Sequence, residues 1–273
     1  MGLPYSSSGF RVDGLSLAVS DSQGVGNTVI FQHGLGGDAR QTAEVFPEPP
    51  FRRVTLECRG HGASDVGELS KLSLATFAED LGTFIDERFD RSVILGGISM
   101  GAALALQVAI RCPQRVTALI LARPAWTVEV APANMQPYAE VGKLLSEHEP
   151  DRASAIFEES DTARRLAVEA PDNLISLRGF FSRRPQAVTA ALLTSIAEDG
   201  PSVDWQTIER ITVPTLVIGH TRDTCHPFNH AIELSQHIST ATLVQITAKA
   251  DDRIRYLSDF RNALRNFLNE ITR

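Results

Sequence analysis

Short apolar runs recur along this chain, and most of them are separated by segments long enough to form a helix. They read LSLAVS (15–20), TVIFQ (28–32), RVTLE (53–57), SVILGG (92–97), VTALILA (116–122), PTLVIGH (214–220) and TLVQIT (242–247). The later runs are rich in Val, Ile and Leu without strict alternation, which is typical of strands covered on both faces. Strands that alternate with helices indicate crossover connections and a parallel sheet. We therefore predict an α/β fold with a mostly parallel eight-stranded sheet and helices on both faces.

The strand rhythm stops between Trp126 and about Trp205. This stretch contains helical patterns such as YAEVGKLLSEHE and AVTAALLTSIAE, and prolines separate them. We interpret residues 127–205 as a helical cap that is inserted between two strands of the sheet. The α/β core domain then consists of residues 1–126 and 206–273.

The bulk composition limits the partners and the compartment. The chain has a net charge of −7, whereas nucleic acids and anionic membranes bind basic surfaces. We therefore expect a small-molecule substrate as partner, no nucleic acid and no membrane, and we leave a homodimer open. The three cysteines are widely spaced and form no Cys/His cluster, so we expect no metal and no cofactor. A cytoplasmic location fits these cysteines and the absence of a signal-peptide pattern at the N-terminus.

The segment GGISMGAAL places a serine between two glycines in the pattern G-x-S-x-G, with Gly97, Ser99 and Gly101. A predicted strand precedes it, and a helix that is apolar on nearly all sides begins at Met100. Glycines let the backbone turn sharply from strand to helix, which presents the serine hydroxyl at the tip of the turn. The N-terminus of the helix also favours negative charge. Ser99 is therefore the predicted nucleophile.

Two backbone N–H groups are candidates for an oxyanion hole. The Gly-rich loop 33–37 directly follows a predicted strand, and such a loop can aim N–H groups at a developing oxyanion. We predict Leu35 as one donor and Met100, the residue after the serine, as the other. His33 is expected to hold this loop rather than to transfer protons. His61, in the turn RGHGAS, is expected to be a partly exposed loop residue.

A carboxylate, Asp223, follows the predicted strand PTLVIGH, and a carboxylate at a strand end can orient a histidine. Four segments follow one another along the chain in the order FQHGLGG, RGHGAS, GISMG and VPTLVIGHTRD. By this order the chain resembles the α/β-hydrolase family, in particular serine hydrolases with a helical cap. The resemblance covers nearly the whole chain. It implies catalysis by a serine, an acid and a histidine in that chain order, with Ser99 and Asp223 as the first two.

The histidine of that set is missing where the family usually has it. The family has a Gly-His pair after the last strand, but this chain reads Lys249-Ala250 there, and no histidine follows His237. A serine hydroxyl without a base is a poor nucleophile. We predict that His226, three residues after Asp223, has taken over the proton transfer. Lys249 as the base, and the lack of any base, are the alternatives.

The side chains that line the substrate pocket are predicted from their positions alone. Arg123 and Trp126 follow a strand at the predicted pocket edge, and we expect Arg123 to bind an anionic or carbonyl group of the substrate. Phe180 and Phe181, in the inserted segment, are expected to form an apolar wall.

Three functions are compatible with these residues. The first is a hydrolase that acts on a small ester, lactone or thioester through a Ser99 acyl-enzyme, with a non-standard general base. The second is a cofactor-free lyase or C–C bond hydrolase on the same fold, because some such reactions ask less of a general base. The third is a catalytically inactive small-molecule binding protein. The intact serine turn favours an enzyme, because a binding protein has no need for a strained nucleophile.

Overall fold

Eight strands form a single sheet in the part of the chain that the computed structural model describes, residues 6–47 and 50–272. Their order across the sheet is β1-β2-β4-β3-β5-β6-β7-β8. The bounds of the strands are β1 Ser6–Val12, β2 Leu15–Asp21, β3 Thr28–Gln32, β4 Arg52–Leu56, β5 Val93–Ile98, β6 Val116–Ala122, β7 Thr215–Gly219 and β8 Ala241–Gln245. Five of the seven neighbouring pairs are parallel. The predicted fold class is therefore confirmed.

The first strand, β1, is the one that the apolar runs did not indicate. It pairs with β2 in the antiparallel sense, and β2 pairs with β4 in the same sense. The segment SSSGFRV has few of the branched apolar residues that mark the other strands. Its register with β2 nevertheless places Phe10 opposite Leu17, and both side chains are buried.

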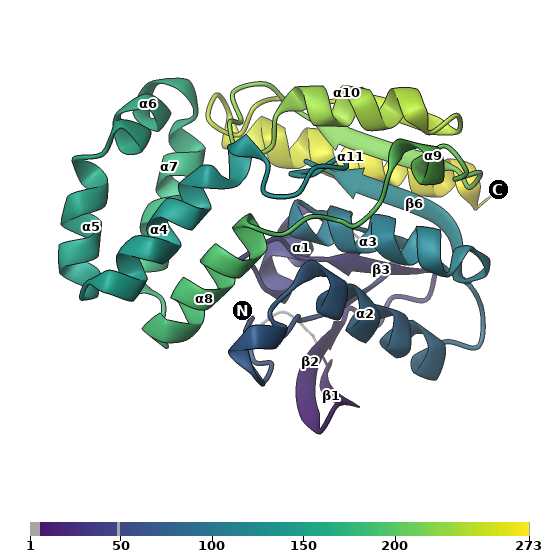
Figure 1. Ribbon diagram of the computed structural model, residues 1–273. Coiled ribbons are helices and arrows are strands. Elements are labelled where there is room, and N and C mark those ends of the chain that lie inside the picture. Colours follow the sequence, from purple (N-terminus) through teal and green to yellow (C-terminus); the bar gives the residue numbers. More distant parts are fainter. Residues whose placement is uncertain (1–5, 48–49, 273) are drawn as a thin grey trace.

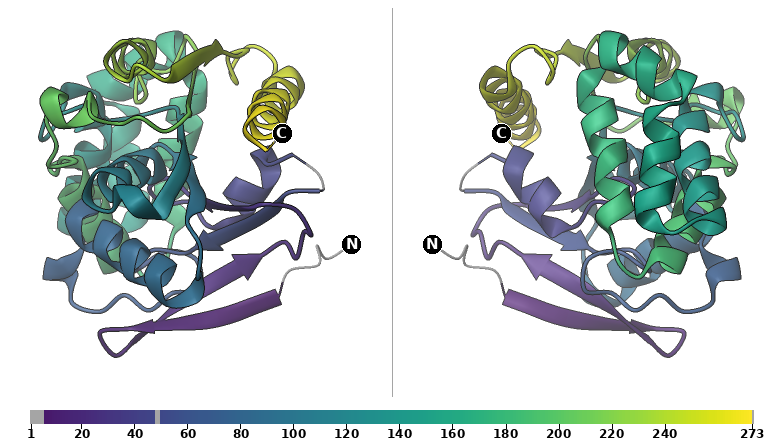
Figure 2. Two further views of the ribbon diagram at one scale, coloured as in Figure 1. Left: turned by 90° about the vertical axis from the view of Figure 1, so that its right-hand side faces the viewer. Right: turned by 90° about the vertical axis from the view of Figure 1, so that its left-hand side faces the viewer.

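Helices cover both faces of the sheet, as Figure 2 shows. The helices that pack on the sheet are α1 Ala39–Val45, α2 Leu74–Arg88, α3 Met100–Arg111, α10 Phe228–His237 and α11 Arg253–Ile271. Buried side chains of α2, α3 and α10, among them Phe77 and Leu104, belong to one apolar cluster. Those of α1 and α11, among them Val45 and Phe260, belong to a second cluster. This double cover explains why the central strands are apolar at successive positions.

Five further helices lie between β6 and β7 in the chain, where the strand rhythm stops. They are α4 Gln136–Glu147, α5 Pro150–Glu158, α6 Asp161–Glu169, α7 Pro171–Arg178 and α8 Gln186–Ala197, and the short helix α9 Trp205–Ile208 follows them. Figure 1 shows the five helices gathered beside the sheet, with α8 packed along α4. Asn173 of α7 contacts the loop that follows β7. The inserted helices therefore lie over the edge at which the parallel strands end.

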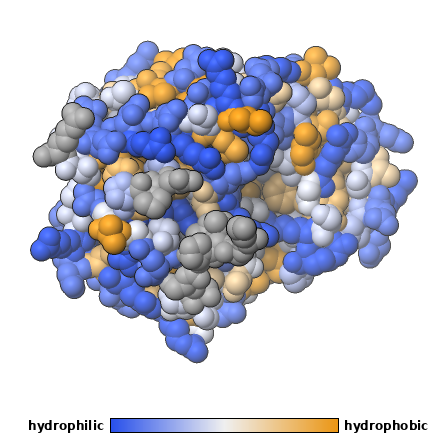
Figure 3. Space-filling model, turned by 180° about the vertical axis from the view of Figure 1, so that it is seen from behind, coloured by the Kyte–Doolittle hydropathy of each residue, from blue (hydrophilic) through white to orange (hydrophobic). Residues whose placement is uncertain are grey.

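The surface is predominantly hydrophilic on the face shown in Figure 3, where apolar side chains form small, separate groups. Large apolar side chains that are strongly exposed include Val25, Val130, Val168, Ile175 and Ile254. Single exposed apolar residues are usual on a globular protein. Across the described residues, no helix combines the length and the apolar character that a membrane crossing requires.

Candidate active site

Ser99 lies in the turn between β5 and α3. Its backbone angles, φ 56° and ψ −112°, fall in a region that non-glycine residues seldom occupy, at a cost of about 1–3 kcal/mol. A Cβ on Gly97 would lie 2.4 Å from the carbonyl carbon of Gly101, and a Cβ on Gly101 would lie 2.5 Å from the carbonyl oxygen of Gln32. Neither position has room for a side chain. The two glycines of the motif are therefore what permits the strained turn at Ser99.

His226 contacts the hydroxyl of Ser99. Its Nε2 lies 2.8 Å from Ser99 Oγ, and its Nδ1 lies 2.9 Å from Oδ1 of Asp223. When Nδ1 carries the proton and donates it to the carboxylate, Nε2 has a free lone pair for the hydroxyl proton. The two nitrogens of the imidazole thus contact Asp223 and Ser99 on opposite sides of the ring. Asp223 and His226 are only three residues apart, on the short loop that precedes Pro227 and α10.

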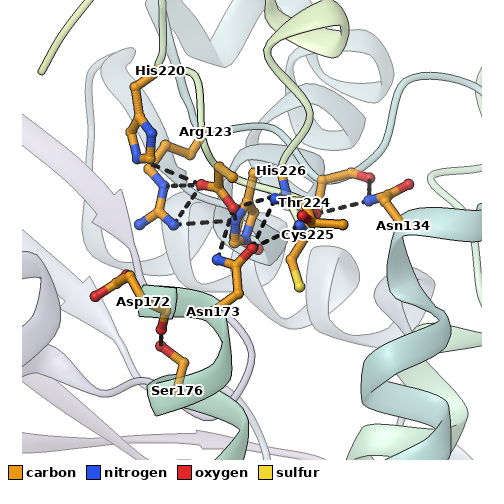
Figure 4. A network of polar contacts seen from close by, with 12 residues as sticks. Arg123, Asn134, Asp172, Asn173, Ser176, His220, Thr224, Cys225 and His226 are labelled. Carbon is orange, nitrogen blue, oxygen red and sulfur yellow. Dashed lines mark hydrogen bonds and ion pairs between the residues drawn. The ribbon is translucent and has the colours of Figure 1, made fainter. Parts of the chain in front are cut away.

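Hydrogen bonds fix the loop from Asp223 to His226, as Figure 4 shows. The backbone N–H of His226 donates to Oδ1 of Asp223 at 3.1 Å. Asn173 donates from Nδ2 to the same oxygen at 2.9 Å. Its Oδ1 accepts from the N–H groups of Thr224 at 2.8 Å and Cys225 at 3.0 Å. One asparagine of the inserted helices therefore holds the carboxylate and the backbone of this loop together.

Arg123 holds the other oxygen of the Asp223 carboxylate. Its Nε and Nη2 lie 2.9 and 2.7 Å from Oδ2, and its Nη1 donates to the hydroxyl of Tyr256 at 3.3 Å. Hydrogen bonds between two charged partners are stronger than those between neutral groups. The guanidinium thus pairs with an acid of the protein itself, rather than with the substrate group for which the sequence predicts it.

Burial and neighbouring charges set the protonation of the acid and the histidine. Burial lowers the pKa of His226, and the Arg123 cation lowers it further, while the Asp223 carboxylate opposes both. Burial alone would raise the pKa of Asp223, but Arg123 and then His226 hold it well below its usual range. The site therefore favours a carboxylate beside a neutral imidazole, which is the state that a general base requires.

The loop 33–37 runs directly past the serine. A Cβ on Gly34 would lie 3.3 Å from the Cβ of Ser99, so the loop backbone packs against the predicted nucleophile. Within the described chain, no acceptor is found for the backbone N–H of Leu35 or of Met100. Two N–H groups without acceptors beside a nucleophile are what an oxyanion hole needs.

Lys249, the alternative base, is engaged elsewhere. Its Nζ lies 2.9 Å from Oδ1 of Asp172 in α7, so the amine is held in an ion pair with an inserted helix. The neighbouring Asp251 pairs with Arg222. Among the described residues, the only hydrogen-bond partner of the Ser99 hydroxyl is therefore the imidazole of His226.

The predicted pocket residues lie in three different surroundings. Phe180 lies over the loop 33–37, because a Cβ on Gly36 would be 2.3 Å from Cε1 of its ring. Trp126 is buried, and its Nε1 donates to a backbone carbonyl at 3.1 Å. Phe181 packs on Phe157 with 5.6 Å between the ring centroids. Phe180 thus contacts the loop 33–37, whereas Trp126 is held by its hydrogen bond and Phe181 packs on another ring of the inserted helices.

Two buried histidines pack together at the loop 33–37. With its proton on Nδ1, His33 donates to the carbonyl oxygen of Gly34 at 2.9 Å, and its Nε2 accepts from the N–H of Cys58 at 3.1 Å. These contacts fit the predicted structural role of His33. The prediction that His61 is partly exposed is wrong, because its ring is fully buried between His33 and Phe77. The packing of α2 on this turn covers it.

Two contacts of the Asp223 site carry no signal in the sequence. Asn173 stands in the first turn of α7, where asparagine is ordinary and indicates only a helix start. Tyr256 stands on α11 among other buried apolar residues. Neither belongs to a motif, and both lie far from Asp223 in the chain, so only the folded structure brings them to the site.

Comparisons with known proteins place this geometry in a family. A model described as "Serine aminopeptidase, S33" matches residues 24–249. The chain is 34% identical over 117 residues to the "Dihydrolipoyllysine-residue acetyltransferase component of acetoin cleaving system" of Cupriavidus necator, which covers 41% of this chain and 30% of that protein. It is 26% identical over 213 residues to the "Putative 2-succinyl-6-hydroxy-2,4-cyclohexadiene-1-carboxylate synthase" of Bacillus subtilis, with 76% and 77% covered. The solved structure of the enol-lactonase from Burkholderia xenovorans matches with a TM-score of 0.70 at 23% identity, over 97% of this chain and 100% of that one.

A strained serine turn at the carboxyl ends of a mostly parallel sheet is the arrangement of the α/β-hydrolases. The family model covers most of the chain, and the chain belongs to this family of α/β-hydrolase enzymes, described as the S33 serine aminopeptidases. It spans less than a third of the Cupriavidus necator relative, but about three quarters of the Bacillus subtilis relative.

Proposed function

We propose that this protein is a serine hydrolase that acts on a small ester, lactone or thioester. Ser99, His226 and Asp223 are its catalytic residues in this proposal, and residues 127–205 form the cap over them. The observation that carries it is the continuous chain of contacts from Ser99 Oγ to Nε2 of His226 at 2.8 Å, and from Nδ1 to Asp223 at 2.9 Å. This spacing permits proton transfer without a further base.

The mechanism follows from these contacts. Ser99 Oγ attacks the carbonyl carbon of the substrate while its proton passes to Nε2 of His226. The oxyanion that forms is stabilised by the N–H groups of Leu35 and Met100. Collapse of this intermediate expels the leaving group, which takes the proton from Nε2 and leaves an acyl-enzyme. A water molecule then attacks the carbonyl carbon of the acyl-enzyme and gives a proton to the same nitrogen. Nε2 returns this proton to Ser99 Oγ as the ester bond to the serine breaks, and the acid product leaves.

The relatives support the substrate class. Solved structures of the same fold include the enol-lactonase of Burkholderia xenovorans and an enzyme described as degrading N-acyl homoserine lactones, at 23% and 19% identity. A lyase or C–C bond hydrolase is the second candidate, which the Bacillus subtilis relative favours because its name is that of a synthase. The strained backbone of Ser99 argues against an inactive binding protein, because binding alone gives no reason to maintain such strain.

A fluorophosphonate should label the wild-type protein at Ser99 and at no other serine, because among the described residues only this serine hydroxyl has a histidine within hydrogen-bond distance. Peptide mapping by mass spectrometry locates the label, and Ser99→Ala is the control. Label on Ser99→Ala would show that the nucleophile is another residue. A panel of aryl esters, lactones and β-diketones then separates the two enzyme candidates, and a wild-type protein that neither labels nor turns over any of them would favour the binding protein.

The value of kcat/KM should rise with pH through an inflection below 6.5, the ordinary pKa of histidine. The base must be neutral, and burial lowers the pKa of His226, so the neutral form persists to lower pH than for an exposed imidazole. A pH profile of kcat/KM with an aryl ester, measured between pH 4.5 and 9, reports this value for the free enzyme. An inflection well above 6.5 would contradict His226 as the base in this environment.

A further inference from the structure

Arg183 lies against the oxyanion loop from the side of the inserted helices. It follows the 3₁₀ turn Gly179–Ser182 that carries Phe180. A Cβ on Gly36 would lie 2.8 Å from Nη1 of Arg183 and 2.3 Å from Cε1 of Phe180. Both side chains therefore touch the same glycine. A positive φ of 73° and this close contact leave no room for any larger residue at Gly36.

The guanidinium of Arg183 has no acid partner in the described chain. No hydrogen bond or ion pair joins it to another residue there, whereas Arg178, in the preceding helix, pairs with Glu158. The carboxylate of Asp38 is near enough to influence Arg183, but it pairs with Arg40 at 2.5 Å and caps α1. Burial accordingly lowers the pKa of Arg183, and Asp38 offsets this only in part. A half-buried cation without a partner gains much from an anion that binds beside it.

The position of this cation relative to Ser99 limits what the anion can be. Gly34 packs on the Cβ of Ser99, and Gly36 is two residues further along, which is at most about 7 Å. Leu35, a donor of the oxyanion hole in the proposed mechanism, stands between them. An acyl group whose carbonyl oxygen binds there would reach Arg183 with a chain of a few methylene groups. The ring of Phe180 offers those methylene groups an apolar surface.

We propose that Arg183 binds a carboxylate at the far end of the acyl group, so that the preferred substrates are esters or lactones of dicarboxylic acids. The proposal rests on the proposed hydrolase function and names the substrate class of that site. A planar guanidinium can bind both oxygens of a carboxylate at once. The charge of Arg183 thereby selects carboxylate-bearing acyl groups over neutral ones of the same length.

Two substrates that differ only in this group provide the test: the p-nitrophenyl hemiester of adipic acid and p-nitrophenyl hexanoate. Arg183→Gln should lower kcat/KM for the adipate hemiester by about 10- to 100-fold, mainly through KM, which is the range for a hydrogen bond to a charged group. It should change kcat/KM for the hexanoate by less than about 3-fold. The matched control is Arg184→Gln, because Arg184 is exposed and, within the described residues, donates only to backbone carbonyls. This control should leave both substrates unaffected.

The possible outcomes separate this proposal from the function on which it rests. Equal losses on both substrates would overturn it, because Arg183 would then support the loop rather than select the acyl group. No loss on the adipate hemiester would overturn it as well. If the wild-type protein hydrolyses neither substrate and is not labelled by the fluorophosphonate, the hydrolase function fails. Binding of adipate, measured by titration calorimetry with wild-type protein and Arg183→Gln, then decides the Arg183 site: a loss of about 10-fold or more in affinity supports it, and equal affinity rejects it.

Discussion

Replacement of His226 by alanine should lower kcat on an aryl ester by about four orders of magnitude, to the level of Ser99→Ala. The imidazole is the only side chain in the described structure that hydrogen-bonds to the Ser99 hydroxyl, so its removal leaves a hydroxyl that keeps its proton. Members of one catalytic unit lose activity together rather than additively. The double variant Ser99→Ala/His226→Ala should therefore be no less active than either single variant. Steady-state kinetics on all three proteins measures this.

The matched control for His226 is Lys249→Ala. Lys249 stands next to the place where the family has its histidine, but its amine is held by Asp172. The substitution breaks the ion pair between α7 and the loop after β8. It should change kcat by less than about 10-fold, because a partly exposed ion pair contributes little free energy. A His226→Ala protein that keeps most of its activity, or a Lys249→Ala protein that loses all of it, would refute the assignment of the base.

The sequence predicts the turn at Ser99 well, because the residues that form it are adjacent in the chain. Gly97 and Gly101 leave room for the tight turn on both sides of Ser99, and a short apolar strand and a buried helix enclose them. The alternation of strands and helices likewise predicts the parallel part of the sheet. The antiparallel strand β1 is missed, because its polar segment gains its place by pairing with β2 rather than by its own pattern.

The surroundings of Asp223 depend on contacts that are distant in the chain. Asn173 reaches this loop from an inserted helix, and Arg123 reaches it from the end of the neighbouring strand β6. The sequence suggests that Arg123 binds substrate, because it does not show whether an arginine is already paired with an acid of the protein. Spacing along the chain does not distinguish a paired arginine from an unpaired one. The positions of Asp223 and His226 likewise do not indicate that Asn173 and Arg123 hold their loop.

Asp223→Asn should lower kcat by about 10³- to 10⁴-fold and destabilise the protein at the same time. The amide can present an N–H to Nδ1 of His226, which favours the tautomer with its proton on Nε2, where it cannot accept the serine proton. The substitution also removes the counter-charge of Arg123, whose side chain is buried beside Asp223. A buried cation without its partner costs about 3–5 kcal/mol of folding free energy. Kinetics on an aryl ester and urea unfolding measure the two effects separately.

The double variant Arg123→Met/Asp223→Asn separates the two roles of this carboxylate. It removes both charges of the pair, so it should regain much of the folding free energy that Asp223→Asn loses. It should remain as inactive as Asp223→Asn, because the tautomer of His226 is still wrong. If the double variant regains activity together with stability, Asp223 serves only as a counter-ion for Arg123, and His226 is oriented by its backbone and by the packing around its ring. If Asp223→Asn remains fully active, the carboxylate takes no part in catalysis.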